Sequence, residues 1–336
     1  MNYCHFIGID VSKKTLDFSL VSEGKVLLHL KVENNKEGIK SFFKKIRKDF
    51  RINYQESIFC LEPNGIYNNI LINELIGIKA NIWVESALQI KQSQGMVRGK
   101  NDKIDSCRIA LYAYRHQEKF IAWNPPRETI SKIKLLLVLR SRIVEAIKQL
   151  ATPVGVDAEI FFSKSDLKLS RNSCESSIKA MKNDVRLIEK QIKELISQDE
   201  NLKKLFKIVM SIEGIGLIIA STIIVATNEF KNFENAKKFS CYSGVVPFEH
   251  SSGSSIRGRT KVSHLANKNV KKMLHLAAIT CIRKDGEFKE YYDRKVSEGK
   301  HKMSVINAIR NKIVLRIFAC VRDNRIFEKK HQIIFA

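Results

Sequence analysis

The sequence predicts a mixed α/β domain at its N-terminal end, followed by a mainly α-helical region. Up to residue 124, short apolar segments of β-strand length alternate with amphipathic segments of helical length. After Pro125 and Pro126 the pattern changes to long segments with helical periodicity. We therefore expect an α/β domain over 1–124, a helical coiled-coil region over 125–206, a mainly helical C-terminal domain over 207–323 and a tail over 324–336.

The stretch from Phe6 to Leu20 predicts how the α/β domain begins. Residues 3–9 have the composition of a buried strand that brings Asp10 to its carboxyl end, and residues 15–21 alternate as a strand that runs back. A carboxylate at the end of a central strand, followed by a small polar turn and a returning strand, is typical of an RNase-H-like sheet. The sugar-kinase and actin group begins in the same way, but this sequence lacks the second glycine-rich phosphate loop and the adenosine motif of that group.

The rest of the α/β domain continues the alternation of strand and helix. Further strands are predicted over 25–32, 57–61 and 80–84, and helices over 37–50, 66–75 and from residue 87. Glu62 directly follows one of these strands, as Asp10 follows the first. The sequence therefore places two carboxylates at strand ends.

A last helix of the α/β domain carries two more carboxylates. It is predicted over 103–114 and is capped at Asp102 or the residue before it. Asp102 and Asp105 are three residues apart, so they lie on one face of the helix. Lys100 and Lys103 stand beside them and are expected to hold the backbone of a nucleic acid.

Four acidic residues form the candidate catalytic site: Asp10, Glu62, Asp102 and Asp105. Clustered carboxylates repel one another unless a cation neutralises them. Ligation by oxygen alone suits Mg²⁺ or Mn²⁺, and two such ions can clamp the attacking and leaving oxygens of a phosphodiester. A single acid of this kind is most often a solvated surface residue, so the prediction rests on the set.

The charge of the chain indicates a polyanionic partner. Its 336 residues carry a formal net charge of +24, and neutralising phosphates releases counterions that drive binding. The lysines are spread along the chain, which disfavours a membrane-surface helix. Seven cysteines without a CxxC pair indicate reduced thiols, and no apolar run reaches ~18 residues. We expect a cytoplasmic, nucleoid-associated protein.

Two long helices are predicted beyond the proline pair, over 130–150 and 173–209. The second carries a heptad-like seam with its other faces charged: Ile178, Met181, Val185, Ile188, Ile192 and Leu195. The seam favours a coiled coil that joins chains into a homo-oligomer, a dimer or a tetramer. An intramolecular helical bundle is the alternative.

Glycines and lysines mark candidate nucleic-acid contacts in the C-terminal domain. Gly214 and Gly216 lie between two predicted helices, as in a helix-hairpin-helix element whose backbone N–H groups approach a phosphate. A tight interhelical turn is the alternative. A helix over 267–282 carries three further candidates on one side, namely Lys268, Lys271 and Lys272.

The segment 250–259 is small, polar and basic, and it predicts an exposed loop. Such a loop suits a nucleophilic serine, because Arg257 and Arg259 would stabilise charge on a phosphorus. Loops of this composition more often bind phosphate or are simply solvated.

Motifs along almost the whole chain resemble the DEDD transposases of insertion-sequence family 110, which are related to the Piv-type DNA invertases. GIDVSKKTLD, LEPNGIY and GKNDKIDSCRIA are similar to the N-terminal RuvC-like domain of that family. IEGIG, FSCYSGVVP, SSG and NKNVKKMLHLAA are similar to its C-terminal transposase domain. The resemblance implies a site-specific recombinase that moves an insertion sequence.

The resemblance also assigns residues. It implies that Asp10, Glu62, Asp102 and Asp105 are the metal-binding tetrad. It implies a serine nucleophile at Ser252, with Ser251 the neighbour that a one-residue slip would select. It further implies donor and target DNA as substrates and a structured guide RNA encoded by the element as a partner. A Holliday-junction resolvase that uses water, and a nucleic-acid-binding protein without activity, remain the alternatives.

Overall fold

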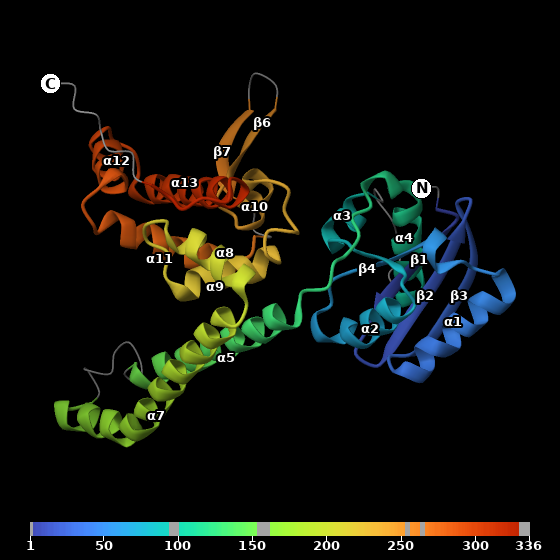
Figure 1. Cartoon of the computed structure of the whole chain (residues 1–336), viewed down its shortest axis with the longest axis horizontal. Helices are drawn as coiled ribbons and strands as arrows, with labels where there is room; N and C mark the ends of the chain where they lie inside the picture. Colours follow the sequence, from blue (N-terminus) through green and yellow to red (C-terminus); the bar gives the residue numbers. More distant parts are fainter. Residues whose placement is uncertain (1–2, 94–100, 153–161, 253–255, 263–265, 329–336) are drawn as a thin grey trace. The chain divides into compact units, whose positions relative to one another are not determined.

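The computed structural model describes residues 3–93, 101–152, 162–252, 256–262 and 266–328. The chain forms two compact units, residues 1–125 and residues 126–336 (Figure 1). Each unit is described by itself below. No helix among the described residues is long and apolar enough to cross a membrane.

A five-stranded mixed sheet forms the centre of the N-terminal unit. Its strand order is β3-β2-β1-β4-β5. The strands are β1 (His5–Val11), β2 (Thr15–Ser22), β3 (Lys25–Glu33), β4 (Ser57–Leu61) and β5 (Asn81–Val84). Strand β2 is antiparallel to β1 and β3, whereas β1, β4 and β5 are parallel. The mixed sheet confirms the α/β domain that the sequence predicts.

Helices cover both faces of this sheet (Figure 1). On one face, α1 (Lys36–Phe50) and α2 (Asn69–Gly77) bury their apolar sides against the odd-numbered residues of β1. On the other face lie α3 (Ala87–Gln92) and α4 (Asp102–Arg115). Three short 3₁₀ turns complete the unit, at Tyr54–Glu56, Gly65–Asn68 and Gln117–Lys119.

Helix α4 packs unusually close to β1. A Cβ atom at Gly8 would lie 2.2 Å from the backbone nitrogen of Ala110 and 2.2 Å from the carbonyl oxygen of Ser106. Only glycine allows this approach. The contact fixes where the N-terminal turn of α4 stands over the sheet.

The C-terminal unit is mainly helical. Its helices are α5 (Glu128–Ala151), α7 (Lys164–Ser197), α8 (Glu200–Met210), α9 (Leu217–Thr227), α10 (Ala236–Tyr242), α11 (Lys268–Ile282), α12 (Glu287–Ser297) and α13 (Lys302–Arg322). One apolar core joins them, with Ile223, Leu274 and Ile313 among its fully buried members. The helix expected over 173–209 is two helices, because the side chain of Asp199 accepts a hydrogen bond from the Leu202 N–H (2.9 Å) and caps α8.

The heptad-like seam of α7 faces this chain's own core over its C-terminal half. Helices α5 and α7 pack against each other, and Arg140 on α5 pairs with Glu189 on α7 at 2.8 Å. Ile188 and Ile192 are buried in the core that also contains Ile133 of α5. The pattern that favoured self-association therefore forms an intramolecular helical hairpin over these residues.

The segment expected as a loop over 250–259 is largely a β-hairpin. Strands β6 (Pro247–Ser252) and β7 (Ile256–Val262) pair antiparallel, and Ser252 is the last residue of β6, opposite Ile256. The expectation of a loop was wrong. It was based on the serines and glycines of the segment, whereas the β-branched residues of β7 favour extended structure. Residues 253–255 lie outside the described part.

Candidate active site

Asp10 lies on β1, on the face that α4 covers. It is two residues beyond Gly8, so both face α4. The side chain is half-buried. Burial, and then the negative charges of Asp102, Asp105 and Asp17, raise the pKa of Asp10 to about 6. The predicted carboxylates of β1 and α4 are therefore close enough to repel one another.

Glu62 stands beside Asp10 at the sheet edge. Strands β1 and β4 are parallel with Ile9 opposite Leu61, so the next residues along each strand are neighbours. The segment that follows β4 is tied to the end of β1, because the Asn64 side chain donates to the Val11 carbonyl oxygen. The sheet register thus joins two members of the predicted tetrad.

The first turn of α4 supplies the other two carboxylates. Asn101 caps the helix by accepting a hydrogen bond from the Ile104 N–H (2.8 Å), and Asp102 and Asp105 follow within the first turn. Carboxylates at this end interact favourably with the helix dipole. Arg108 donates to Asp105 at 3.0 Å. Asp102 is the more exposed of the two acids.

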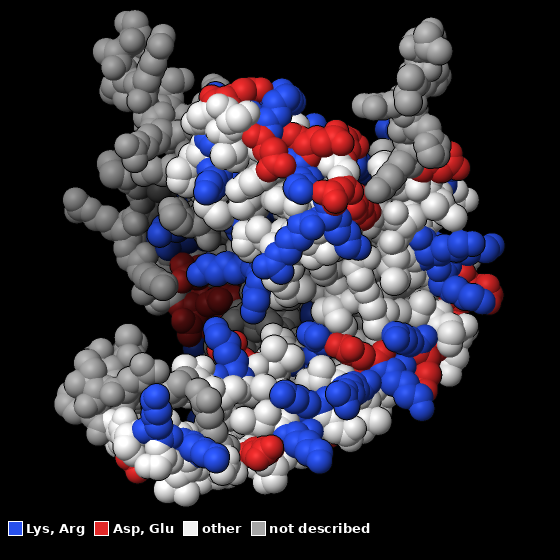
Figure 2. All heavy atoms as spheres, turned by 90° about the vertical axis from the view of Figure 1, so that its left-hand side faces the viewer, with Lys and Arg blue, Asp and Glu red and all other residues white. Residues whose placement is uncertain are grey.

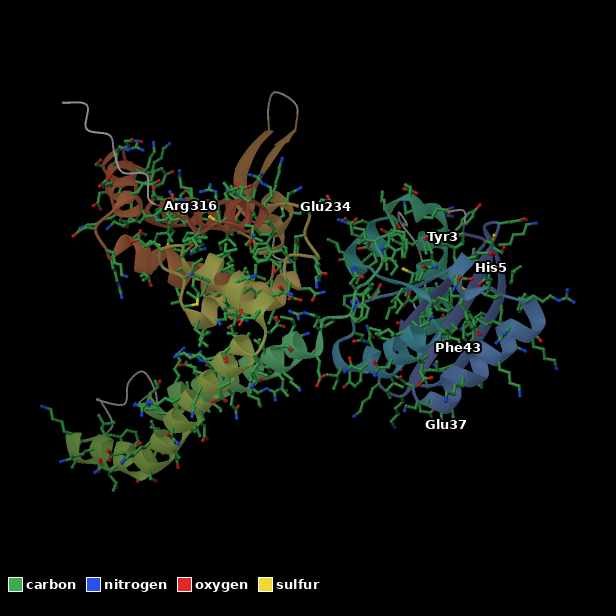
Figure 3. All side chains as sticks on the ribbon, in the orientation of Figure 1. Tyr3, His5, Glu37, Phe43, Glu234 and Arg316 are labelled. Carbon is green, nitrogen blue, oxygen red and sulfur yellow. The ribbon has the colours of Figure 1, made fainter. Side chains whose placement is uncertain are left out.

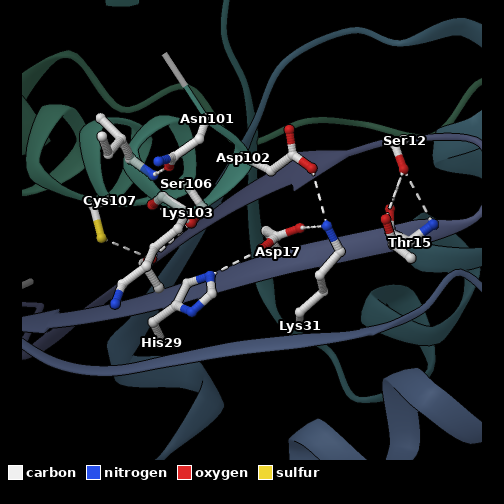
Figure 4. Close-up of polar contacts among 12 residues, drawn as sticks. Ser12, Thr15, Asp17, His29, Lys31, Asn101, Asp102, Lys103, Ser106 and Cys107 are labelled. Carbon is white, nitrogen blue, oxygen red and sulfur yellow. Dashed lines mark hydrogen bonds and ion pairs between the residues drawn. The ribbon is translucent and has the colours of Figure 1, made fainter. Parts of the chain in front are cut away.

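A buried aspartate that the sequence did not single out adjoins this cluster. Asp17 on β2 is 3% exposed and lies opposite Asp10 in the antiparallel register. Its two oxygens accept from His29 Nε2 (2.9 Å) and Lys31 Nζ (3.2 Å) of β3. Lys31 also donates to Asp102 at 3.0 Å, and Figure 4 shows it bridging the two carboxylates.

Lys31 is therefore held by acids on two elements. Hydrogen bonds to Asp102 and then to Asp17 raise the pKa of Lys31, so its ammonium group is protonated at neutral pH. The register places Lys31 opposite Asp17, and Asp17 opposite Asp10. The sequence offered one weak sign of this arrangement, which is a charged residue at a buried position of β2.

Glu85 extends the row of carboxylates to the fifth strand. It follows β5, and because Leu61 lies opposite Val84, Glu85 is the neighbour of Glu62. Tyr112 of α4 donates to Glu85 at 3.2 Å, and burial together with Glu85 raises the pKa of Tyr112. Glu85 directly follows a short apolar strand, and this position in the sequence could have identified it as a candidate. The acidic row is defined here by Asp17, Asp10, Glu62 and Glu85.

The candidate metal ligands at the carboxyl ends of β1 and β4 and on α4 suit a hard divalent cation. All its candidate ligands are carboxylate oxygens, which Mg²⁺ and Mn²⁺ prefer. Burial is the largest cause of the raised pKa of Asp10, and the nearby negative charges of Asp102, Asp105 and Asp17 add to it, a repulsion that a cation would relieve. Within the part of the chain that the structure describes, no group of three His, Cys, Asp or Glu side chains is close enough to hold a metal ion.

Two lysines of the N-terminal unit, Lys100 and Lys103, are candidate nucleic-acid contacts, and the structure describes the second of them. Lys103 is exposed in the first turn of α4. Lys100 lies outside the described residues. Figure 2 shows Lys and Arg spread over one face of the molecule, with Asp and Glu between them.

The two glycines before α9 differ in their surroundings. Gly214 has a φ of +80°, and a Cβ there would lie 2.5 Å from the Ala277 carbonyl oxygen of α11. It is required for packing, which supports the reading as a tight interhelical turn. Gly216 is exposed at the start of α9 with open space around it, so its phosphate contact stays a prediction.

The other candidates of the C-terminal unit lie on β7 and α11. Lys268 and Lys272 are exposed near the start of α11, and Lys271 between them is half-buried. Arg257 lies opposite Ser251 in the hairpin register, and Arg259 is two residues further along β7. Each unit therefore carries its own group of candidate residues.

Comparison with known proteins gives a consistent result for both units. The family model "Transposase" with a DEDD domain matches residues 7–153, and the model "Transposase IS116/IS110/IS902 family" matches residues 206–293. The chain is 24% identical over 329 residues to the pilin gene-inverting protein of Moraxella bovis, covering 97% of this chain and 98% of that protein. It is 29% identical to a 43.6 kDa protein of insertion element IS110 from Streptomyces coelicolor, covering 47% and 38%.

The Thermus thermophilus RuvC structure aligns with 35% of this chain and 98% of its own, at 14% identity and a TM-score of 0.27. The two family models together span more than half of the 336 residues and agree on one family. The chain belongs to the IS116/IS110/IS902 family of DEDD transposases, enzymes that cleave and rejoin DNA.

Proposed function

We propose that this protein cleaves and rejoins DNA at the ends of an insertion sequence, with Asp10, Glu62, Asp102 and Asp105 as a metal-binding tetrad. The observation that carries the proposal is the electrostatic state of Asp10, whose pKa is raised by burial and by Asp102 and Asp105. A protein keeps such a repulsive cluster when a cation binds there.

The four residues have different positions and hence different tasks. Asp10 lies on β1 and Glu62 directly follows the adjacent parallel strand β4, so the sheet positions both. Asp102 and Asp105 belong to a helix turn, and Asp102 is held by Lys31 at 3.0 Å. When bound, Mg²⁺ or Mn²⁺ would supply charge neutralisation and orientation at a phosphodiester.

The nucleophile in this proposal is the hydroxyl of Ser252. It attacks the scissile phosphorus, forms an Oγ–P bond and displaces a deoxyribose oxygen, which leaves DNA joined to the protein. The place of Ser252 at the end of β6 supports the proposal. A resolvase mechanism would use water instead, and Ser252 would then be a spectator.

Substitution of the tetrad tests the metal site. Asp10→Asn, Glu62→Gln, Asp102→Asn and Asp105→Asn should each lose strand cleavage with Mg²⁺ or Mn²⁺ while DNA binding is retained, since the basic surface is unchanged. Asp184→Asn, at an exposed position of α7, is the matched control. Cleavage at the wild-type rate by any two of the four variants would show that the assignment is wrong.

A second experiment separates serine from water. Labelled DNA is incubated with protein, which is then denatured, and retention of label on the protein is measured. Ser252→Ala should bind DNA and show no retained label, whereas Ser251→Ala should have a milder effect. Continued recombination by Ser252→Ala would favour the resolvase mechanism, and loss only in Ser251→Ala would move the nucleophile by one residue.

The proposal includes a guide RNA and a homo-oligomer as partners. The net charge of +24 supports a polyanionic partner besides DNA. The outer face of α5 exposes Leu135 (60%), Val138 (43%) and Leu139 (38%), which supports association with a second copy. Sequencing of co-purified RNA tests the first. Light scattering of the Leu135→Glu, Val138→Glu double variant tests self-association through α5. If its mass equals that of wild type, this face of α5 is not the contact between copies.

A further inference from the structure

A buried arginine in the C-terminal unit has no acidic partner. Arg310 of α13 is 5% exposed. Its Nη1 donates to Asn307 Oδ1 at 3.4 Å and its Nη2 donates to His275 Nδ1 at 2.6 Å. Its Nε is buried and has no hydrogen-bond partner. Among the described side chains, none of the ion pairs includes Arg310.

Two partly exposed arginines of this unit are paired with acids. Arg127 bonds both Asp199 and Glu229, and Arg316, labelled in Figure 3, pairs with Glu287. Taking a charge out of water without a counter-charge is costly, and buried arginines are almost always paired. Burial alone lowers the pKa of Arg310. This guanidinium therefore has the environment of a group that lacks its anion.

Two further donors surround Arg310. Burial and the charge of Arg310 lower the pKa of Lys271 and of His275, both on α11. Arginine can only donate, so His275 Nδ1 accepts and its Nε2 carries the proton. Lys271, His275 and Asn307 are partly exposed, so the group reaches solvent. The cationic cluster is defined here as Arg310, Lys271 and His275.

The cationic cluster stands at the base of the β6–β7 hairpin. Asn307, which accepts from Arg310, also donates to the Val245 carbonyl oxygen at 2.7 Å, two residues before β6. A Cβ atom at Gly244 would lie 3.7 Å from Lys271 Nζ. On the other flank of the hairpin, the Asn267 N–H donates to the Tyr242 carbonyl oxygen at 2.8 Å. Both ends of the hairpin are thus fixed next to the cluster.

We propose that the cationic cluster binds one phosphate of a nucleic-acid backbone and so positions a strand relative to the hairpin, an inference that rests on the proposed function. The cluster offers the unpartnered Nε–H of a guanidinium, an ammonium group and an imidazole N–H, and none of its three members is an acid, which matches this ligand. Ser252 lies seven residues beyond Val245, which at about 3.3 Å per residue is on the order of 20 Å. The bound phosphate is therefore a positioning contact and not the scissile one.

Thermal melting of the full-length protein with inorganic phosphate tests the site without nucleic acid. Wild type should gain about 2–4 °C from phosphate at tenfold its dissociation constant. Arg310→Met should gain less, and without phosphate it should melt at the wild-type temperature or above, because it removes an unpaired buried charge. General salt effects act on both proteins equally. Arg316→Met is the control, since its guanidinium is already paired, and it should keep the phosphate response.

Binding to nucleic acid over a series of salt concentrations tests the source of the phosphate. Arg310→Met should bind labelled DNA about tenfold more weakly and lower the slope of log K against log salt by about one. Lys271→Gln provides a second variant at a half-buried position. An unchanged slope together with a phosphate response would mean that the site takes free phosphate, which overturns the nucleic-acid assignment.

Equal phosphate responses in wild type and Arg310→Met would overturn the site itself. If wild type binds no nucleic acid, the proposed function fails, and the melting experiment still decides whether the cationic cluster binds phosphate.

Discussion

Replacing Asp10 by asparagine should stabilise the metal-free N-terminal unit at neutral pH. Asparagine keeps the shape of the side chain and can still accept from the Val11 N–H, but it removes one of several mutually repelling charges. The pKa of Asp10 rises from 3.8 to about 6 on folding. The folded chain thus binds a proton more readily than the unfolded chain between these values.

The size and sign of the effect follow from this difference. The pKa of Asp10 differs by about two units between the folded and unfolded chains. At 1.36 kcal/mol per unit, the ionised Asp10 can destabilise the folded state by at most about 3 kcal/mol. Asp10 is only half-buried, so solvent screening reduces the expected value to about 1.5 kcal/mol. The destabilisation is absent below about pH 4 and is complete above about pH 7. Asp10→Asn should therefore gain stability relative to wild type as pH rises through this window.

Tryptophan fluorescence during urea unfolding measures this unit alone. The chain has two tryptophans, Trp83 and Trp123, and both lie in the N-terminal unit. Millimolar Mg²⁺ should stabilise wild type and have a smaller effect on Asp10→Asn. An exposed-site control in the same unit, Asp49→Asn on α1, should change stability by less than about 0.5 kcal/mol at either pH. Equal destabilisation by Asp10→Asn at pH 4 and pH 7.5 would refute the electrostatic reasoning.

Three further predictions follow from other contacts. Lys31→Met should lower the Mg²⁺ concentration needed for half-maximal stabilisation by about fivefold, because it frees Asp102 from an ion pair; an unchanged titration would refute this. Gly214→Ala should cost about 3 kcal/mol by calorimetry and Gly216→Ala far less, because only the first has a positive φ and a close neighbour. Ile188→Asp should lower the melting temperature through burial of a charge within one chain, and a loss of mass by light scattering without destabilisation would contradict that.

Local patterns in the sequence were sufficient to predict most elements. The strand at 57–61 has the predicted bounds, and the caps at Asn101 and Asn267 begin helices where polar side chains precede apolar periodicity. The seam of α7 shows the limit of such patterns. A heptad repeat specifies an apolar stripe but not its partner, and here α5 of the same chain covers part of it.

The surroundings of the tetrad depend on register, which no single segment specifies. Asp17 lies opposite Asp10 on one side and opposite Lys31 on the other. A shift of one residue in either pairing would place these side chains on opposite faces of the sheet. Arg310 also depends on its surroundings in the fold. It lies on the buried face of α13 with Ile306, Ile309 and Ile313, and its contact with His275 is supplied by α11.

The acidic row gives a physical reason for coupling between cation binding and DNA binding at this edge. The chain as a whole is strongly basic, so a phosphate backbone is attracted to most of its surface. At the acidic row the sign reverses, and Lys31 pairs with Asp17 at one end of the row and with Asp102 of α4. A phosphate approaching Asp10 would be repelled by its carboxylate. Divalent cations would remove that barrier, so Mg²⁺ should strengthen DNA binding by wild type and have little effect on binding by Asp10→Asn.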